Sequence, residues 1–460
     1  MTKARSVLAI LLGLFAVLTL LDRFVLVELL LRRTSIPLLL AVTMALAMVG
    51  IGALLRRAKQ LDFPLDLLIG YPIFGTLCFL IGMLKISVWT LAPLVALGLL
   101  AAIVLFLRRY AGDADKRPAS EALTAPLWPA VAVVAVLVCA FVAAQAPPSS
   151  LDELAYHLAV PHAWVLEGRV VELPLLSQSY FPLGIESADL LPLVLLGPSD
   201  GGVTSHFLHL LAAIATTLLI ARRTKSWMAT AAIVTTPALA ITGGWSLVDW
   251  PLAGLFVALF VALEDEDLGT ASAATAAGLL TKYTFAPFAL VAWAIFWWRK
   301  RPVPQWQLLL GGVFFVRNLI VAGNPFAPFF GADAPHVSGF RALALADYIF
   351  EGTSIDEALG ASLVILPVFA VGAVALASIA IAAARSFLAP SSRILVPYLV
   401  VPAITAAPEL RRRVVSVLIA ISIVVQTFLV IWFAARTNAF TLLAASATEE
   451  EYLRKQRPSY

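Results

Sequence analysis

Residues 147–197 read PPSSLDELAYHLAVPHAWVLEGRVVELPLLSQSYFPLGIESADLLPLVLLG and form the longest polar-rich interval of this chain. Acidic, basic, histidine and aromatic side chains lie close together in this interval, which we call the first loop. The sequence on both sides of it consists mainly of long apolar runs, and these runs decide the fold class. A connection of this length between two apolar spans is more often functional than idle.

The composition of the 460-residue chain, 61% hydrophobic and 13% charged, excludes an ordinary soluble domain. Soluble domains carry roughly 25% charged residues. Apolar runs of about 20 residues are long enough to cross a bilayer as helices, and a helix satisfies its own backbone polar groups there. We therefore expect an all-α fold, a polytopic transmembrane bundle of about 12–14 spans whose extracytoplasmic loops carry short amphipathic helices.

Apolar spans are expected on both sides of the first loop. Before it they lie near residues 6–31, 36–54, 66–84, 86–107 and 127–144. After it they lie near residues 204–221, 227–243, 247–263, 268–281, 284–298, 305–322, 361–384, 393–408 and 412–434.

Clusters of Lys and Arg beside the spans indicate sidedness, because cytoplasmic loops are enriched in these residues. Placing the clusters at 56–59 and 108–117 in the cytoplasm makes the first loop extracytoplasmic. The same rule favours a cytoplasmic position for Arg411–Arg413 and an extracytoplasmic C-terminal tail. That arrangement requires residues 361–392 to enter and leave on the same face. With a net charge of only +4, we expect these cations to mark topology, and we expect no nucleic-acid partner.

The sequence suggests three parts. Residues 1–126 are interpreted as added N-terminal transmembrane helices, and 127–435 as a transmembrane core. The core has extracytoplasmic loops at 145–203 and 323–360. Residues 436–460 form a polar tail.

The beginning of the first loop supplies two adjacent carboxylates. Ser150 and Glu153 have the Ser-x-x-Glu spacing of a capping box, which starts a helix. Glu153 is therefore either a cap or a second catalytic carboxylate, whereas Asp152 is left in the first helical turn, where the helix dipole favours its ionised form. Tyr156 lies four residues after Asp152 and shares its face, and His157 likewise shares the face of Glu153.

Basic and amide side chains near the expected outer face are candidates for binding an anionic group. Charges inside apolar runs are costly and usually have a partner or a function, although Lys and Arg can also extend to the membrane interface. Asp249 is a possible partner for one of these cations. The candidate substrate-binding residues, with the two in the first loop, are Tyr156, His157, Lys282, Tyr283, Arg317, Asn318, Asn324 and Arg393.

A divalent cation is a possible cofactor, but its ligands are unknown. His206 and His209 share a helix face, and together with Asp152 and Glu153 they are residue types that bind such ions. No tight ligand motif accompanies them, and histidines at a membrane interface are common. The sequence therefore allows a divalent cation and assigns no ligand to it.

Several fragments, in their order, resemble the GT-C superfamily of integral-membrane glycosyltransferases, and most closely its bacterial protein-mannosyltransferase and aminoarabinose-transferase types. The resemblance covers about residues 145–460 and rests on DELAYHLAVPHAWVLEGRV, YFPLGIESADLLPLVLLG, WSLVDWPLA, GLLTKYTFAPF, VRNLIVAGNPFAPFF, SSRILVPYLVVPA and TEEEYLRKQRPSY.

The resemblance implies a glycosyltransferase with a polyprenyl-phosphate-linked sugar as donor, an extracytoplasmic acceptor, and a bacterial inner membrane as its location. The family's first-loop acid corresponds to Asp152, which would act as the base. Lys282, Arg317 and Arg393 would hold the phosphate, and Asn318 and Asn324 would shape the nearby loop.

Two other functions use the same features. A transporter or flippase for lipid-linked sugars would need the groove and the cations but no base, and such proteins tend to show matching broken helices in two halves. A non-catalytic binding subunit that kept the fold is the third possibility. The segment after Gly360 supports it, because Ile394 follows Arg393 where the family's Arg-Tyr-x-x-Pro-like segment has a tyrosine.

Overall fold

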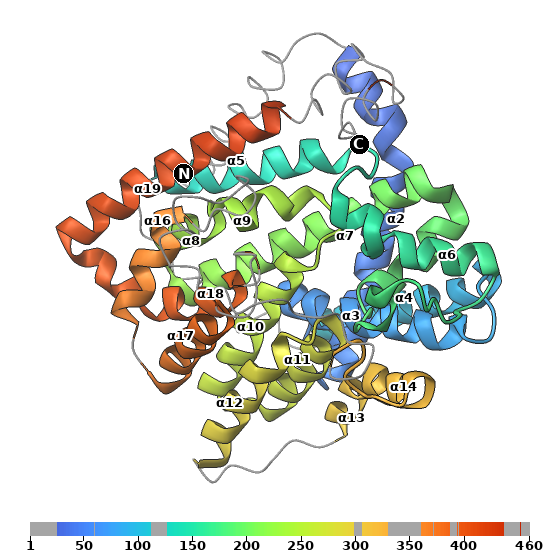
Figure 1. Cartoon of the computed structure of the whole chain (residues 1–460). Helices are drawn as coiled ribbons and strands as arrows, with labels where there is room; N and C mark the ends of the chain where they lie inside the picture. Colours follow the sequence, from blue (N-terminus) through green and yellow to red (C-terminus); the bar gives the residue numbers. More distant parts are fainter. Residues whose placement is uncertain are drawn as a thin grey trace.

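The computed structural model describes residues 25–58, 60–111, 127–298, 306–329, 360–370, 372–386, 393, 395–436 and 451. The described residues contain helices and no strands, which confirms the all-α prediction. Figure 1 shows these helices packed into one bundle. The predictions for residues 1–24, for most of the loop 323–360 and for nearly all of the tail 436–460 lie outside the described residues.

The helices follow the apolar runs. Before the first loop they are α2 (Val25–Leu55), α3 (Phe63–Gly82), α4 (Val88–Ala111) and α5 (Leu127–Ala144). The first loop itself contains η1 (Glu153–His157), α6 (Ala159–Glu167), η2 (Ser177–Tyr180) and η3 (Glu186–Asp189). After it come α7 (Leu190–Thr224), α8 (Trp227–Val234), α9 (Pro237–Ala240), η4 (Ile241–Gly244), α10 (Asp249–Glu264), α11 (Leu268–Thr281), α12 (Phe285–Trp298), α13 (Gln307–Gly311), α14 (Val313–Ala322), α16 (Gly360–Ile365), η6 (Leu366–Phe369), α17 (Ala373–Ser386), α18 (Val396–Thr405), η8 (Ala407–Arg411) and α19 (Arg413–Arg436).

Six of the described helices are long and apolar enough to cross a membrane, and the bent pair 227–244 would make a seventh. The chain is thus a multi-pass membrane protein, and its described part contains fewer full-length spans than the apolar runs of that part suggest. The expected span 247–263 is a helix of 16 residues, and 268–281 is one of 14. The expected span 227–243 is broken, with a bend of 74° before Pro237. The break falls at Thr235 and Thr236, inside a run whose mean composition is still that of a span.

The centre of the bundle is formed by α3, α7, α10 and α11, whose side chains are largely buried. The helices α4, α5 and α19 instead expose apolar side chains, as expected of helices that face lipid. In Figure 1, α5 and α19 lie side by side along one edge of the bundle. The division expected at residue 126 stays a prediction; α2 and α3, which precede it, pack against α7.

Glycines let α2 and α3 approach closely. A Cβ atom at Gly52 would lie 2.0 Å from the carbonyl oxygen of Asp66, and one at Gly70 would lie 1.8 Å from that of Met48. Small residues of this kind allow the backbones of membrane helices to touch. The helix pair is therefore held by contacts that a larger side chain would prevent.

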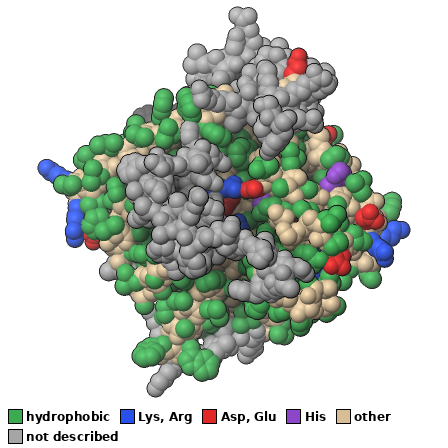
Figure 2. Space-filling view, viewed as in Figure 1, with side chains coloured by type: hydrophobic (Ala, Val, Ile, Leu, Met, Phe, Trp, Pro, Cys, Tyr) green, Lys and Arg blue, Asp and Glu red, His purple; other side chains and the backbone are tan. Residues whose placement is uncertain are grey.

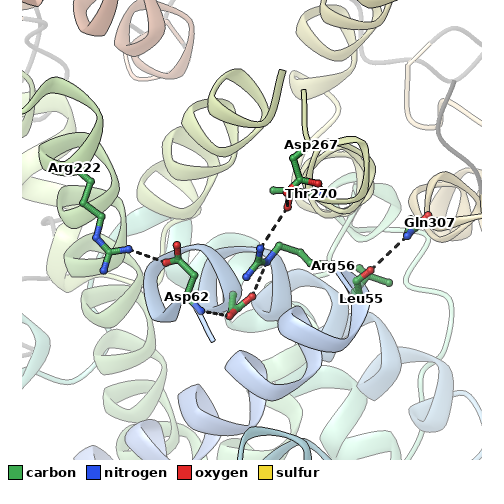
Figure 3. A network of polar contacts seen from close by, with 8 residues as sticks. Leu55, Arg56, Asp62, Arg222, Asp267, Thr270 and Gln307 are labelled. Carbon is green, nitrogen blue, oxygen red and sulfur yellow. Dashed lines mark hydrogen bonds and ion pairs between the residues drawn. The ribbon is translucent and has the colours of Figure 1, made fainter. Parts of the chain in front are cut away.

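A polar network joins helix ends at one end of the bundle (Figure 3). Arg56, just after α2, donates to buried Asp66 over 2.7 Å. Arg222, near the end of α7, donates to Asp62 over 2.8 Å. Asp267 caps α11 by accepting from the Thr270 N–H at 3.0 Å. The network brings the ends of α2 and α7 together with the starts of α3 and α11.

The first loop lies at the opposite end, where α3 and α11 finish and α10 begins. The N–H of Val170 donates to the Gly82 carbonyl at the end of α3 over 2.8 Å. The N–H of Gly184 donates to the Leu280 carbonyl at the end of α11 over 2.9 Å. A Cβ at Gly75 would lie only 1.7 Å from the carbonyl oxygen of Gly184, so the loop rests directly on the backbone of α3.

The start of α19 lies at the end of the bundle away from the first loop. Phe369 at the end of η6 lies 6.0 Å beneath the guanidinium of Arg412, at the start of α19. Phe433, near the other end of α19, contacts Trp245, which precedes Ser246 at the first-loop end. The segment α16–η6 therefore runs away from the first-loop end and α17 returns, because Arg393 is again found beside Asp152.

Candidate functional site

A cavity of about 250 Å³ opens at the first-loop end of the bundle. Five segments that are distant in the sequence contribute to its wall. The lining residues are Asp152, Tyr156, His157, Phe181, Pro182, Glu186, Leu247, Val248, Asp249, Thr281, Lys282, Tyr283, Thr284, Phe329 and Arg393. Figure 2 shows a largely apolar surface on which charged side chains meet in small groups, one of them near the middle of the face.

Asp152 and Arg393 form an ion pair across the cavity wall. Asp152 lies in the first turn of the loop helix, and Arg393 lies just before α18. The Asp152 side chain keeps 36% of its surface exposed, so its carboxylate is reachable from the cavity mouth. The pair therefore joins the most accessible carboxylate of the site to one of its two cations.

Glu153 does not line the cavity. Its fully buried carboxylate accepts from the N–H groups of Ser150 at 3.0 Å and Ser246 at 2.6 Å, and contacts His206 Nε2 at 2.7 Å. The Glu153 N–H in turn donates to Ser150 Oγ at 3.4 Å, which completes the expected capping box. Glu153 thus ties the loop helix to α7 and to the segment before α10.

The environment of Glu153 favours its ionised form. Burial alone would raise the pKa of this carboxyl, but the neighbouring His206 and the donated N–H groups lower it to about 2. A carboxylate that accepts several hydrogen bonds in this way holds the backbone around it and has little freedom to accept a further proton from a substrate.

His157 and Glu186 form a second pair of polar side chains in the wall. His157 Nδ1 lies 2.8 Å from Glu186 Oε1, and both side chains are only 3% exposed. The ring of Tyr156 stacks beside His157 with centroids 3.9 Å apart. Burial, followed by the negative charges of Glu186, Asp152 and Asp249, raises the pKa of Tyr156 well above its usual 10.0. Its phenol therefore stays protonated and can donate a hydrogen bond into the cavity.

Lys282 and Asp249 line the same cavity without forming a pair. Lys282 follows the last residue of α11 and is half-buried. Asp249 begins α10 and is 5% exposed. Within the described residues, neither side chain takes part in an ion pair or a side-chain hydrogen bond.

Arg317 points to the loop backbone and lies outside the cavity lining. Its Nη1 donates to the Ser179 carbonyl at 2.9 Å and to Asn318 Oδ1 at 2.9 Å. Its guanidinium also lies 5.1 Å from the centre of the Tyr180 ring. These contacts position η2 against α14.

Asn318 connects the same loop to the cavity wall. Its Nδ2 donates to the Tyr180 carbonyl and to Tyr283 Oη, both at 2.7 Å. Tyr283 Oη lies 3.1 Å from the Ala327 carbonyl, to which it can donate. Burial, the largest effect, raises the pKa of Tyr283 to about 12, so this phenol is protonated at neutral pH.

Asn324 shapes the turn after α14. Its Nδ2 donates to the Phe329 carbonyl at 2.6 Å, and its Oδ1 accepts from the Phe326 N–H at 3.0 Å. The turn brings the Phe329 ring onto Phe181, with centroids 5.8 Å apart and nearly parallel planes. Asn324 therefore acts on the cavity indirectly, through an aromatic wall.

The structure brings together six of the ten residues singled out from the sequence. In the cavity lining are Asp152, Tyr156, His157, Lys282, Tyr283 and Arg393. Outside the lining, supporting it, are Glu153, Arg317, Asn318 and Asn324. Sequence reasoning did not select Glu186, Asp249 or Phe329 as site residues; the first two are charges next to apolar runs, which is a usable signal.

The four residues considered for a divalent cation do not gather into one site. Asp152 pairs with Arg393, whereas Glu153 contacts His206. His209 Nδ1 lies 2.9 Å from the Ser205 carbonyl and 3.2 Å from the hydroxyl of Tyr71. No group of three or more His, Cys, Asp or Glu residues in the described part of the chain is arranged to hold a metal ion.

Comparison with known proteins adds no family to this geometry: no protein-family model matches the chain, and neither curated proteins nor solved structures give a significant match.

Proposed function

We propose that the chain is a membrane glycosyltransferase that moves a sugar from a polyprenyl-phosphate carrier to an acceptor outside the cytoplasm. One observation carries the proposal: an accessible carboxylate, Asp152, shares a small cavity with two cations, Lys282 and Arg393. Glycosyl transfer needs a base for the acceptor and positive charge for the departing phosphate. The ordered sequence fragments that resemble GT-C glycosyltransferases support the same reading.

In the proposed reaction, an acceptor hydroxyl or amine attacks the anomeric carbon of the donor sugar. A bond forms between the acceptor atom and this carbon, while the bond from the carbon to the phosphate oxygen breaks. The electron pair of the broken bond stays on the phosphate, which Lys282 and Arg393 stabilise. Asp152 takes the proton of the acceptor, and direct displacement inverts the anomeric configuration.

The ion pair between Asp152 and Arg393 fits this sequence of events. A phosphate held by Arg393 competes with Asp152 for the guanidinium, because one cation then faces two anions. The carboxylate becomes available as a base when the donor is in place. The Arg393 side chain is only 19% exposed, and apolar surroundings make this competition stronger than it would be in water.

The proposed location is a bacterial inner membrane, and the position of the basic residues in the bundle supports a cavity on its extracytoplasmic face. The ends of α2 and α7, which carry Arg56 and Arg222, lie at the end of the bundle opposite the cavity. The positive-inside rule assigns such an end to the cytoplasm. Activated nucleotide sugars are not expected on the extracytoplasmic side of the membrane, where the cavity would lie, so a lipid-linked sugar is the more suitable donor.

The test is transfer by the purified full-length protein from a radiolabelled polyprenyl-phosphate sugar. Removing a general base lowers rates by about 10²–10⁴-fold, so Asp152→Asn should reduce transfer by that factor at unchanged expression and melting temperature. Lys282→Met should lower both transfer and donor binding. Asp265→Asn, in the exposed turn after α10, is the matched control and should behave as wild type.

Normal transfer by Asp152→Asn would show that this residue is not the base. Tight donor binding without transfer by the wild type would instead favour the binding subunit or the transporter, neither of which needs a base.

A further inference from the structure

Asp249 is the one carboxylate of the cavity wall that has no charged or hydrogen-bonding partner within the described residues. The other two carboxylates are paired, Asp152 with Arg393 and Glu186 with His157. Asp249 is only 5% exposed and nonetheless lines the cavity. Its side chain forms no ion pair with Lys282, which lines the same cavity.

A carboxylate that lines a cavity without a protein partner is open to a ligand. Charged residues at apolar spans usually mark a binding pathway. The helix N-terminus at which Asp249 lies favours its negative charge, but it does not supply a side-chain donor. We therefore expect a ligand in the cavity to supply hydrogen-bond donors to Asp249.

The cavity offers opposite charges at two unpaired points. Lys282 suits an anionic group, whereas Asp249 suits a group that bears N–H or O–H donors. A ligand that contacts both Lys282 and Asp249 must carry an anionic group and hydrogen-bond donors on one small molecule or headgroup. A cavity of about 250 Å³ lies below the roughly 300–1,000 Å³ of pockets for drug-sized ligands, so it fits a single small ring.

The remaining wall agrees with a ring that has polar edges and apolar faces. Phe181 and Phe329 stack with an interplanar angle of 7°, and Tyr156 meets Phe181 edge to face with centroids 5.9 Å apart. Most small-molecule sites combine such apolar and aromatic surfaces with a few polar groups that fix the ligand's orientation.

We propose that Asp249 recognises the transferred sugar itself by accepting hydrogen bonds from its donor-bearing substituents, hydroxyl or ammonium groups. Lys282 and Arg393, which line the same cavity, hold the phosphate. This inference rests on the proposed glycosyltransferase function and assigns a specificity-determining residue to it. Asp249 selects the sugar, and the two cations bind the carrier irrespective of the sugar.

The test compares the affinities of three probes for the purified full-length protein: undecaprenyl phosphate alone, the same carrier with a neutral hexose, and the carrier with an amino sugar. The measured quantity is the ratio between the Kd of the bare carrier and the Kd of each sugar-bearing carrier. Losing a hydrogen bond to a charged group should lower this ratio about 10- to 100-fold in Asp249→Asn and Asp249→Ala. The Kd of the bare carrier should not change.

Lys282→Met should raise the Kd of all three probes by a similar factor, and Asp265→Asn should leave all three Kd values unchanged. The sugar-bearing probe that loses affinity in the Asp249 variants identifies the recognised group as hydroxyl or ammonium. Suppose that the wild-type protein transfers sugar, and that folded Asp249 variants keep the wild-type ratio between the Kd of the bare carrier and the Kd of each sugar-bearing carrier. That result would overturn the inference and leave the proposed function standing. A wild-type protein that neither prefers a sugar-bearing carrier nor transfers sugar would overturn both.

Discussion

Replacing Glu153 by Gln tests whether this carboxylate holds the first loop in place. Lowering its pKa from the usual 4.5 to about 2 corresponds to about 3 kcal/mol of folding free energy at neutral pH. Breaking a buried ionic contact by removing one partner costs about 3–5 kcal/mol, which agrees. Gln also turns one acceptor oxygen into an NH₂ group that faces N–H donors. We therefore expect Glu153→Gln to lose about 3 kcal/mol of stability.

The pH dependence carries the same information with a defined sign. Because the folded-state pKa is depressed, the stabilisation is complete above pH 4.5 and is lost as the pH falls through about 2. Denaturant titrations followed by tryptophan fluorescence, at pH 7 and between pH 5 and 2, measure both effects. The stability of wild type should fall more steeply in the acid range than that of Glu153→Gln.

The control is Glu167→Gln, an exposed carboxylate at the end of α6. A surface substitution of this kind changes stability by only about 0.5 kcal/mol. A Glu153→Gln protein that is as stable as the control at pH 7, with the wild-type acid profile, would refute the argument that Glu153 anchors the loop.

Two further predictions address packing and topology. Gly75→Ala places a methyl group where only 1.7 Å separates it from the Gly184 carbonyl oxygen; the overpacking should cost about 1–3 kcal/mol, and an unchanged melting temperature would contradict the close contact. Leu175 is a fully exposed residue of the first loop, and the two native cysteines, Cys78 and Cys139, are buried and can be kept. Leu175→Cys should therefore react with an impermeant maleimide on intact spheroplasts. Asp265→Cys should react only after permeabilisation, and the reverse pattern would invert the proposed orientation.

Local sequence signals predicted much of the helical framework. The apolar runs located α3 to α5 and α19, and the Ser-x-x-Glu spacing gave the capping interaction of Ser150 with Glu153. The expected end of a span at residue 31 was wrong, because α2 is one helix from Val25 to Leu55 that continues through Arg32 and Arg33. Both signals come from residues that are close together in the sequence, so they can be recognised before the fold is known. The lengths of the inner helices could not be read in this way. For example, the expected span 227–243 is divided into α8 and α9, with a bend of 74° between them.

The composition of the site was harder to predict, because it depends on contacts across the chain. Asp152 and Arg393 are 241 residues apart, and no spacing rule pairs them. Asp249 had a signal, a charge within an apolar run, which suggested only a partner for a cation. Phe329 had none, since a phenylalanine in an apolar turn is indistinguishable from one that faces lipid. Arg317 is also a charge within an apolar run, and it was therefore predicted to bind phosphate. The structure shows that it donates to the Ser179 carbonyl instead.

The measurement that tests the central claim most directly uses membranes from cells with and without this chain. Radiolabelled polyprenyl-phosphate sugars are added, and label that moves to a non-lipid acceptor is counted for wild type and for Asp152→Asn. The proposed function predicts transfer that requires the chain and falls by about 10²–10⁴-fold in the variant. Equal transfer with and without the chain, across the panel of sugars, would contradict it.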